Sequence, residues 1–370
     1  MLFVKSDELK TGMRLAKPIY NKIGVMLYER NSKLTSQGII SIQNFGLIGV
    51  YILEPAEPVP PMTEDDIEFE RFQAMAIFTI KDVLDQIKRE EEPKGLYPFA
   101  NQILKSYGSL YHKINFVQNL RSADDFTYKH ALNTAILCAL MSKKMKFEFK
   151  KQLDVVIAGI IHDMGGLMYT PALRKKPTAE YTEEDLKEIE GFHMAGYQLL
   201  GRNKDLDTNA KVVAQMALAE LHDLKSDFSS DKRPEELEVL KVASVFDAET
   251  AMKYGEEPLS EITALRHLKD EANGYDQTVV QALVDSINIL QPGVCVELNN
   301  GDKGLVIAEG PDDILHPFVL SFRDNHVINL GETGLPEEYQ IKDIMKTMDN
   351  RHVINRDLLE AYKGSTIHKN

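Results

Sequence analysis

Residues 155–166 read VVIAGIIHDMGG, and this stretch is the most informative part of the sequence for the fold. Seven apolar residues precede the polar pair His162 and Asp163, and two glycines end the segment. A continuous apolar run next to such a break predicts the end of a helix buried in a core. An unpaired carboxylate there would be costly, so the pair should have a defined role. Imidazole and carboxylate side by side offer two kinds of metal ligand.

Outward from this segment, residues 97–290 have the apolar spacing of successive helices separated by short breaks. Before and after these helices, apolar and polar residues alternate with a period of two, which is typical of strands. A chain of 370 residues is long enough for two or three domains. We therefore expect a mainly α fold. Its parts are a small N-terminal α/β module (1–55), a linker and helix (56–96), a helical bundle (97–290), a small C-terminal antiparallel β unit (291–345) and a helical tail (346–370).

The composition restricts the class of partner. A net charge of −14 disfavours binding to a nucleic acid polymer, although a small nucleotide remains compatible with it. The densest basic run is Arg174, Lys175 and Lys176. No apolar run approaches the roughly 20 residues of a membrane span, and the N-terminus lacks a secretory apolar region. With only Cys138 and Cys295, a disulfide framework is not expected, and a cytoplasmic location fits.

Two further histidines lie where chemistry could use them. His130 falls in a helix predicted to start near Asp124, and His193 falls in a helix predicted to start at Thr182. A single histidine on an apolar helix is more often a hydrogen-bonded core residue than a ligand. Imidazoles from several helices that meet at one point are, however, typical of metal sites, so the combination matters more than any member.

Four separated motifs together resemble the HD-GYP subgroup of the HD phosphohydrolase superfamily. They are YKHALNTA at 128–135, AGIIHDMGG at 158–166, the stretch 173–200, and LKVASVFDAET at 240–250. The resemblance covers about residues 120–290. It implies a helical bundle that holds iron- or manganese-type metals, which activate a water to cleave the phosphodiester of cyclic di-GMP. It also implies that His130, His162, Asp163 and His193 are metal ligands, with His162 and Asp163 catalytic in an active protein.

The sequence departs from the family pattern at several positions. Counting back about thirty residues from Val242 places the family's paired histidines at Gln215 and Met216, and its metal-binding aspartate is Ser244. Glycine replaces the lysine after the HD pair, and no Gly-Tyr-Pro loop follows. Amide, thioether and hydroxyl groups are poor ligands for a hard dication. Gln215, Met216 and Ser244 are therefore predicted to be lost ligand positions.

Two residues could compensate for these losses. Asp247 follows Ser244 by one helical turn, and we interpret it as a group that supports the ligands from behind or caps the helix. His222 lies seven residues beyond Gln215, about 10 Å along a helix, and we interpret it as part of a solvated helix end.

Three functions remain open. The leading hypothesis is a degenerate HD-GYP-like signalling protein that binds a nucleotide, such as cyclic di-GMP, or a partner protein, with little or no phosphodiesterase activity. The first alternative is an active metal-dependent phosphohydrolase, and the second is a helical scaffold without activity. At most one divalent iron- or manganese-type metal is expected, and none is equally compatible. Lys175 and Lys176 are candidate substrate contacts. Membrane insertion is not expected, and a homodimer is left open.

Overall fold

The structure is a computed structural model of the chain, and it describes all residues except 1, 22–24, 54–62, 227, 229–232 and 346–370. Residues 56–62 of the predicted linker and the predicted helical tail at 346–370 lie outside the described residues.

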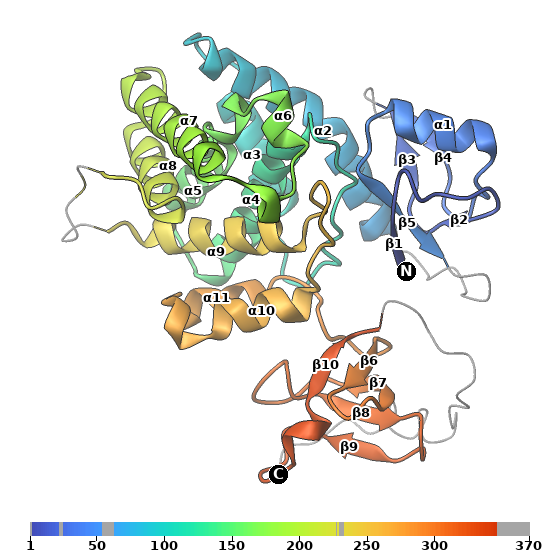
Figure 1. The fold of residues 1–370 in the computed structure, drawn as a ribbon. Helices are drawn as coiled ribbons and strands as arrows, with labels where there is room; N and C mark the ends of the chain where they lie inside the picture. Colours follow the sequence, from blue (N-terminus) through green and yellow to red (C-terminus); the bar gives the residue numbers. More distant parts are fainter. Residues whose placement is uncertain (1, 22–24, 54–62, 227, 229–232, 346–370) are drawn as a thin grey trace.

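A helical bundle forms the centre of the molecule (Figure 1). Its α-helices are α3 (Leu96–Ser106), α4 (Phe126–Lys144), α5 (Phe149–Ile161), α6 (Pro171–Arg174), α7 (Glu183–Arg202), α8 (Thr208–Leu221), α9 (Glu235–Thr250), α10 (Glu261–Lys269) and α11 (Gln277–Val284). Short 3-10 turns are η1 (Gly166–Met168), η2 (Thr178–Glu180) and η3 (Glu271–Asn273). Helix α4 packs most extensively on α5 and α9 and is buried almost throughout, so it is the core helix of the bundle.

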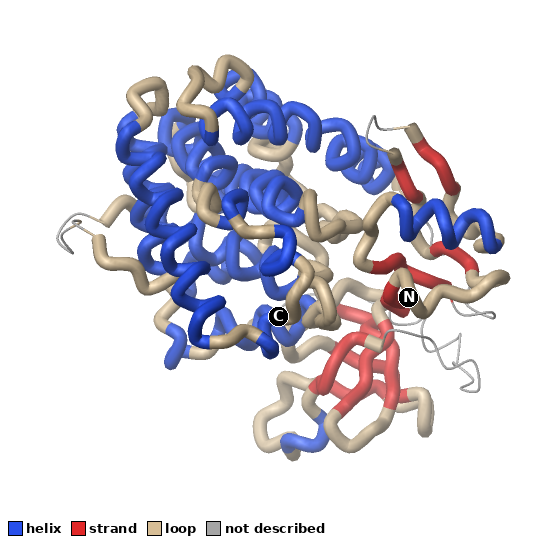
Figure 2. Tube along the Cα trace, turned by 45° about the horizontal axis from the view of Figure 1, so that its top comes forward, coloured by secondary structure: helices blue, strands red, loops and turns tan. Residues whose placement is uncertain are grey.

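The N-terminal module combines short strands with one helix. Its elements are β1 (Leu2–Lys5), β2 (Arg14–Leu15), β3 (Ile19–Tyr20), β4 (Met26–Tyr28), α1 (Ser36–Asn44) and β5 (Gly49–Leu53). Strand β5 lies between β1 and β2, antiparallel to both, while β3 and β4 form a separate pair. Helix α2 (Glu64–Lys88) extends from this module along the bundle (Figure 2). The Thr63 hydroxyl accepts from the Asp66 amide at its start, as a capping box requires.

The C-terminal β unit is a single antiparallel sheet with the order β10-β6-β7-β8-β9. Its elements are β6 (Cys295–Leu298), β7 (Lys303–Ala308), β8 (Phe318–Ser321), β9 (Val327–Asn329), the 3-10 turn η4 (Glu337–Tyr339) and β10 (Ile341–Ile344). Arg266 of α10 donates to the backbone carbonyl of Lys342, which ties the sheet to the bundle.

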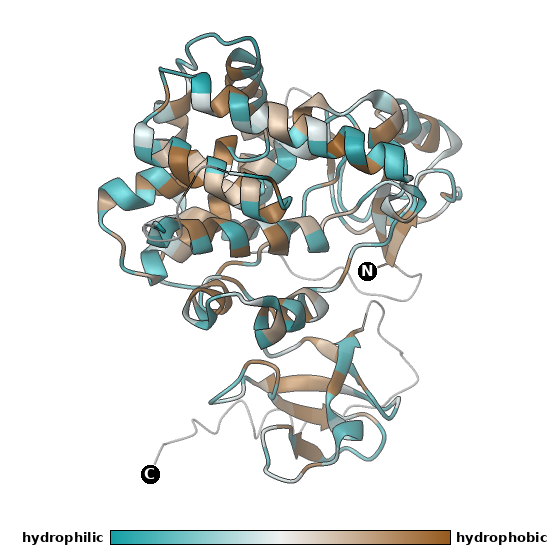
Figure 3. Ribbon diagram, turned by 60° about the vertical axis from the view of Figure 1, so that its left-hand side comes forward, coloured by the Kyte–Doolittle hydropathy of each residue, from teal (hydrophilic) through white to brown (hydrophobic). Residues whose placement is uncertain are grey.

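The expected mainly α fold, with small sheets near both ends, is confirmed. Hydrophobic and hydrophilic residues alternate along the bundle helices (Figure 3), the pattern of amphipathic helices around a shared core. Among the described helices, none is both long and apolar enough to span a membrane. The limits of the individual domains remain a prediction.

Candidate metal centre

The polar residues singled out in the helices line one cavity of about 430 Å³ in the bundle. Its chemically useful lining residues are His130, His162, Asp163, His193, His222 and Ser244. They come from α4, from the turn after α5, from α7, from the end of α8 and from α9. Most are buried, whereas His222 is exposed at the surface. These groups form two clusters within the cavity.

The inner cluster consists of His130, His162 and Ser244. The two Nε2 atoms lie 3.2 Å apart, and the Ser244 hydroxyl lies 3.2 Å from His130 Nε2 and 3.0 Å from His162 Nε2. His162 Nδ1 donates to the Gly159 carbonyl at 2.9 Å, and burial lowers the pKa of His162 to about 4. The His162 ring is therefore neutral near pH 7, and its Nε2 presents a lone pair to the cavity.

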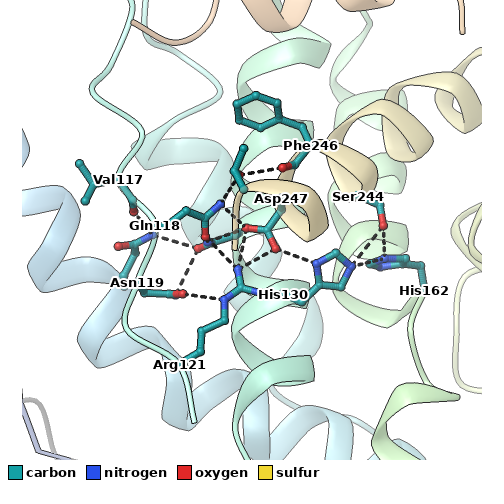
Figure 4. A network of polar contacts seen from close by, with 12 residues as sticks. Val117, Gln118, Asn119, Arg121, His130, His162, Ser244, Phe246 and Asp247 are labelled. Carbon is teal, nitrogen blue, oxygen red and sulfur yellow. Dashed lines mark hydrogen bonds and ion pairs between the residues drawn. The ribbon is translucent and has the colours of Figure 1, made fainter. Parts of the chain in front are cut away.

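Asp247 fixes the orientation of His130 from behind (Figure 4). His130 Nδ1 lies 2.7 Å from an Asp247 oxygen, and Arg121 Nη2 donates to both Asp247 oxygens at 2.7 Å. The Arg121 and Asp247 side chains are fully buried. Burial alone would raise the pKa of Asp247, but Arg121 and His130 hold it well below its ordinary value. The carboxylate thus keeps the proton of His130 on Nδ1 and directs Nε2 at the cavity.

Gln118 and Asn133 complete this network. The Gln118 side-chain amide donates to Asp247 at 3.0 Å and to Thr250 at 2.8 Å, and the Asn133 amide donates to Asp247 at 2.8 Å. A buried carboxylate of this kind is stable only when its lone pairs are satisfied. Asp247 thus lies behind His130, and its role in supporting a metal ligand remains a prediction.

The outer cluster consists of Asp163, His193 and His222. One potential ligand atom from each lies within 4.8 Å of the other two. His193 Nδ1 is 3.9 Å from an Asp163 oxygen, and the rings of His193 and His222 stack with centroids 3.5 Å apart. Tyr169 contacts His193 Nε2 at 2.7 Å, and His193 Nδ1 is buried without a hydrogen-bond partner among the residues that the structure describes. A buried imidazole nitrogen in that position is well suited to ligate a cation.

Glycines allow the turn after α5 to approach α7 this closely. A Cβ atom on Gly165 would lie 2.5 Å from His193 Nδ1, and one on Gly196 would lie 2.5 Å from the Gly165 amide nitrogen. The Gly166 amide donates to Asp163 at 3.0 Å and holds the carboxylate toward the cavity. Burial opposes ionisation of Asp163, but the surrounding imidazoles, with His193 foremost, lower its pKa below the ordinary value.

The register of α8 places His222, and neither Gln215 nor Met216, at the cavity. Gln215 donates to the Tyr197 carbonyl at 3.0 Å, Met216 packs in the core, and neither lines the cavity. The residue of α8 that meets His193 is His222, at the C-cap of the helix. The interpretation of Gln215 and Met216 as lost ligand positions remains a prediction, and in the structure neither side chain faces the cavity. Seven residues, or about two helical turns, separate Gln215 from His222.

Some of the basic residues line the cavity and others do not. Arg174, Lys176 and Lys253 line it, whereas Lys175 is exposed and does not. Lys176 also pairs with Asp185 at 2.6 Å. Of the two predicted substrate contacts, the structure thus places Lys176 at the cavity and Lys175 away from it. Lys253 was not predicted from the sequence, since no local pattern distinguishes it from other surface lysines.

A family model described as an HD domain matches residues 117–279. The chain is similar to the cyclic di-GMP phosphodiesterase PdeB of Borreliella burgdorferi, with 20% identity over 243 residues. That match covers 64% of this chain and 62% of PdeB, so the chain spans less than two thirds of that relative. A solved structure, Bd1817, a HDG"Y"P protein from Bdellovibrio bacteriovorus, matches with a TM-score of 0.45 and 14% identity, over 77% of this chain and 98% of that one.

Proposed function

We propose that this chain is an HD-GYP-type member of the HD domain family, and that it is a signalling protein that binds a divalent cation and a small phosphorylated nucleotide. The observation that carries the proposal is the buried, unpartnered His193 Nδ1 beside Asp163 and His222. The preferred nucleotide is cyclic di-GMP, the substrate in the name of the similar protein PdeB. Hydrolysis should be slow, for the reason given below.

The donor set fits an iron- or manganese-type cation. Asp163, His193 and His222 combine one carboxylate with two imidazoles, the ligand types used by such metals. The inner pair also fits a shared ion, since two nitrogens that ligate one ion at ~2.1 Å each lie roughly 3–3.4 Å apart. The Nε2 atoms of His130 and His162 are 3.2 Å apart. A bound cation would supply Lewis acidity toward a phosphate oxygen and a water.

The cavity wall supports a nucleotide ligand. Arg174, Lys176 and Lys253 provide positive charge for phosphate oxygens, in a chain whose net charge is −14. Tyr181 and Tyr254 lie along the same wall and offer ring faces on which a base can stack. This combination suits a compact phosphorylated nucleotide better than a polymer.

Slow hydrolysis follows from Ser244. A carboxylate at this position would add a second negative charge beside the two imidazoles, whereas the serine hydroxyl is neutral. The inner pair then offsets less of the charge of a dication in a buried site. An interaction of this kind, made at the reacting atoms, changes rates by about 10²–10⁴-fold.

His222 favours a second candidate function, an active phosphodiesterase. Its ring stacks on His193 and contributes to the outer cluster, so it supplies an imidazole that the sequence count had assigned as lost. If both clusters bind metal, paired ions could stabilise the attacking and leaving oxygens. The degenerate and active functions therefore differ in rate and in metal content.

Metal content and the rate of cyclic di-GMP hydrolysis distinguish the degenerate function from the active one. We expect Mn²⁺-loaded protein to bind cyclic di-GMP, to lose that binding when the metal is removed, and to hydrolyse it far below the ~1–10³ s⁻¹ of ordinary enzymes. His193→Ala should lose metal and nucleotide together, whereas His326→Ala, at a distant and exposed histidine, should not. Turnover within the ordinary range would establish the second candidate. Mn²⁺-loaded protein that does not bind cyclic di-GMP would refute the nucleotide assignment.

A further inference from the structure

A second cavity, of about 250 Å³, lies between the N-terminal module, α2 and the segment 117–129. It shares no lining residue with the candidate metal centre. Ile19, Ile77 and Val117 contribute apolar surface, and Lys17 and Glu70 contribute charge. Small-molecule sites in proteins are typically apolar pockets with a few placed polar groups, and they often lie between domains. This cavity has both properties.

Lys17 is the unusual residue of the second cavity. Its ammonium donates to the Gln118 carbonyl at 3.0 Å and lies 4.2 Å from the centre of the Tyr51 ring. Among the described residues, no carboxylate lies within ion-pair distance of it. Burial lowers the pKa of Lys17 to about 8, although Glu70 opposes that shift. A largely enclosed ammonium that has no carboxylate partner is stabilised when an anion binds beside it.

The other lysines of the cavity are Lys129 and Lys81, and Lys81 is exposed and lies 5.6 Å from the centre of the Tyr128 ring. Lys129 is already paired with Asp125 at 2.6 Å. Glu70 faces the cavity from α2, and burial raises its pKa, which Lys17 partly offsets. The cavity therefore presents an unpaired ammonium, a carboxyl group and an apolar wall to the same small volume.

We propose that this second cavity binds a small carboxylic acid with an apolar body. The carboxylate pairs with Lys17, and the apolar part packs against Ile19, Ile77 and Val117. An amino acid shares this chemistry and would in addition place its ammonium toward Glu70. The volume is below the ~300–1,000 Å³ of drug-sized sites, which restricts the ligand to metabolite size.

The location of Gln118 connects this cavity to the metal centre. Its backbone carbonyl accepts from Lys17, and its side chain donates to Asp247 at 3.0 Å. Asp247 in turn contacts His130 Nδ1 at 2.7 Å (Figure 4). A ligand carboxylate that draws Lys17 away from Gln118 therefore alters the hydrogen bonding directly behind His130. The bound acid acts as an effector of the HD cavity.

Calorimetry on the full-length, metal-free protein tests the binding, so the result does not depend on the proposed metal site. The probes are phenylacetate, phenylalanine and the uncharged phenylacetamide. At least one of the two carboxylates should bind saturably, and the amide should not. Lys17→Met should weaken binding by roughly tenfold to a hundredfold, the worth of a charge-assisted hydrogen bond. Lys105→Met, at an exposed lysine of α3, should leave binding unchanged.

Two further variants test the binding of the carboxylate independently of Lys17→Met. Ala74→Phe fills the cavity without touching Lys17 and should abolish binding even if Lys17→Met folds poorly. Glu70→Gln should weaken phenylalanine alone if the ligand is an amino acid, and neither carboxylate if it is a simple acid. The proposal is overturned if wild-type protein binds neither carboxylate, or if Ala74→Phe binds as tightly as the wild type.

The coupling between the second cavity and His130 is measured separately, by NMR. Ring-nitrogen NMR signals of His130 in the metal-free protein should shift when the binding carboxylate is added, and should not shift in Gln118→Met, which lacks the donor to Asp247. Unchanged His130 signals in the wild type would show that the cavity is not an effector site.

Discussion

At the residue scale, the candidate ligands form two groups within one cavity. His130, His162, Asp163 and His193 all line one cavity. The resemblance implied that all four are metal ligands, and the structure brings His130 and His162 together as an inner pair and Asp163 and His193 together in an outer group. The sequence determines which helix carries each residue. The direction of its side chain depends on how the helices pack, and the spacing of residues along the chain does not show that. Their roles as ligands remain a prediction.

Ser244 decides the charge of the inner cluster. Ser244→Asp should raise the affinity for Mn²⁺ by at least roughly 10–100-fold, the size of effect associated with groups that only support ligands. Ser244→Asn has the same shape without the charge and should give no such gain. Both are compared by metal titration, with His162→Ala added to Ser244→Asp as a control. An unchanged affinity in Ser244→Asp would mean that this position does not serve a metal.

The buried ion pair of Arg121 with Asp247 is expected to contribute more to the free energy of unfolding than an exposed ion pair does. The Arg121 guanidinium and the Asp247 carboxylate are both fully buried, so Arg121→Met leaves an uncompensated charge in the core. The free energy of unfolding, measured in urea, should fall by about 3–5 kcal/mol. Arg202→Met removes an exposed pair with Glu90 and should cost no more than about 1 kcal/mol. Equal effects of the two substitutions would contradict the buried network.

At the scale of single elements, local signals predicted helix starts well and helix register poorly. Thr182 caps α7 with a reciprocal bond to Asp185, as its sequence pattern indicated. Counting residues did not predict which position of α8 faces the cavity, because that depends on how α8 packs against α7. The useful signal was the spacing of His222 from Gln215, which places both on one helix face.

This register makes a specific prediction for α8. Gln215→His should leave Mn²⁺ affinity unchanged, because position 215 faces the Tyr197 carbonyl rather than the cavity. The measurement is the same metal titration, with thermal unfolding to confirm that the variant folds. A large gain in affinity would restore the original count and contradict the observed register.

At the scale of the whole molecule, the change of periodicity along the chain predicted the order of a mixed module, a helical bundle and a β unit. What it could not predict is the contact between the module and the bundle, because Lys17 and Gln118 are 101 residues apart. Long-range contacts of this kind depend on the complete packing. They leave no pattern within either segment.

This interface gives the stability a pH dependence. In the unfolded chain Lys17 keeps its proton to about pH 10.5, whereas in the folded chain its pKa is about 8. The unfolded state therefore binds more protons between these values, and stability contributed by Lys17 rises with pH by up to ~1.4 kcal/mol per unit. Urea unfolding at pH 8 and pH 10 should show this rise in wild type relative to Lys17→Met. Identical slopes would contradict the enclosure of Lys17.

The central claim is that Asp163, His193 and His222 bind a divalent cation, and one measurement tests it most directly. Mn²⁺ is titrated into metal-free wild-type protein, into His222→Ala and into His326→Ala, whose histidine is exposed and distant from the cavity. We expect saturable binding to the wild type and to His326→Ala, and binding at least roughly 10–100-fold weaker in His222→Ala, since it lacks a direct ligand. Equal affinity in His222→Ala and the wild type would contradict the account.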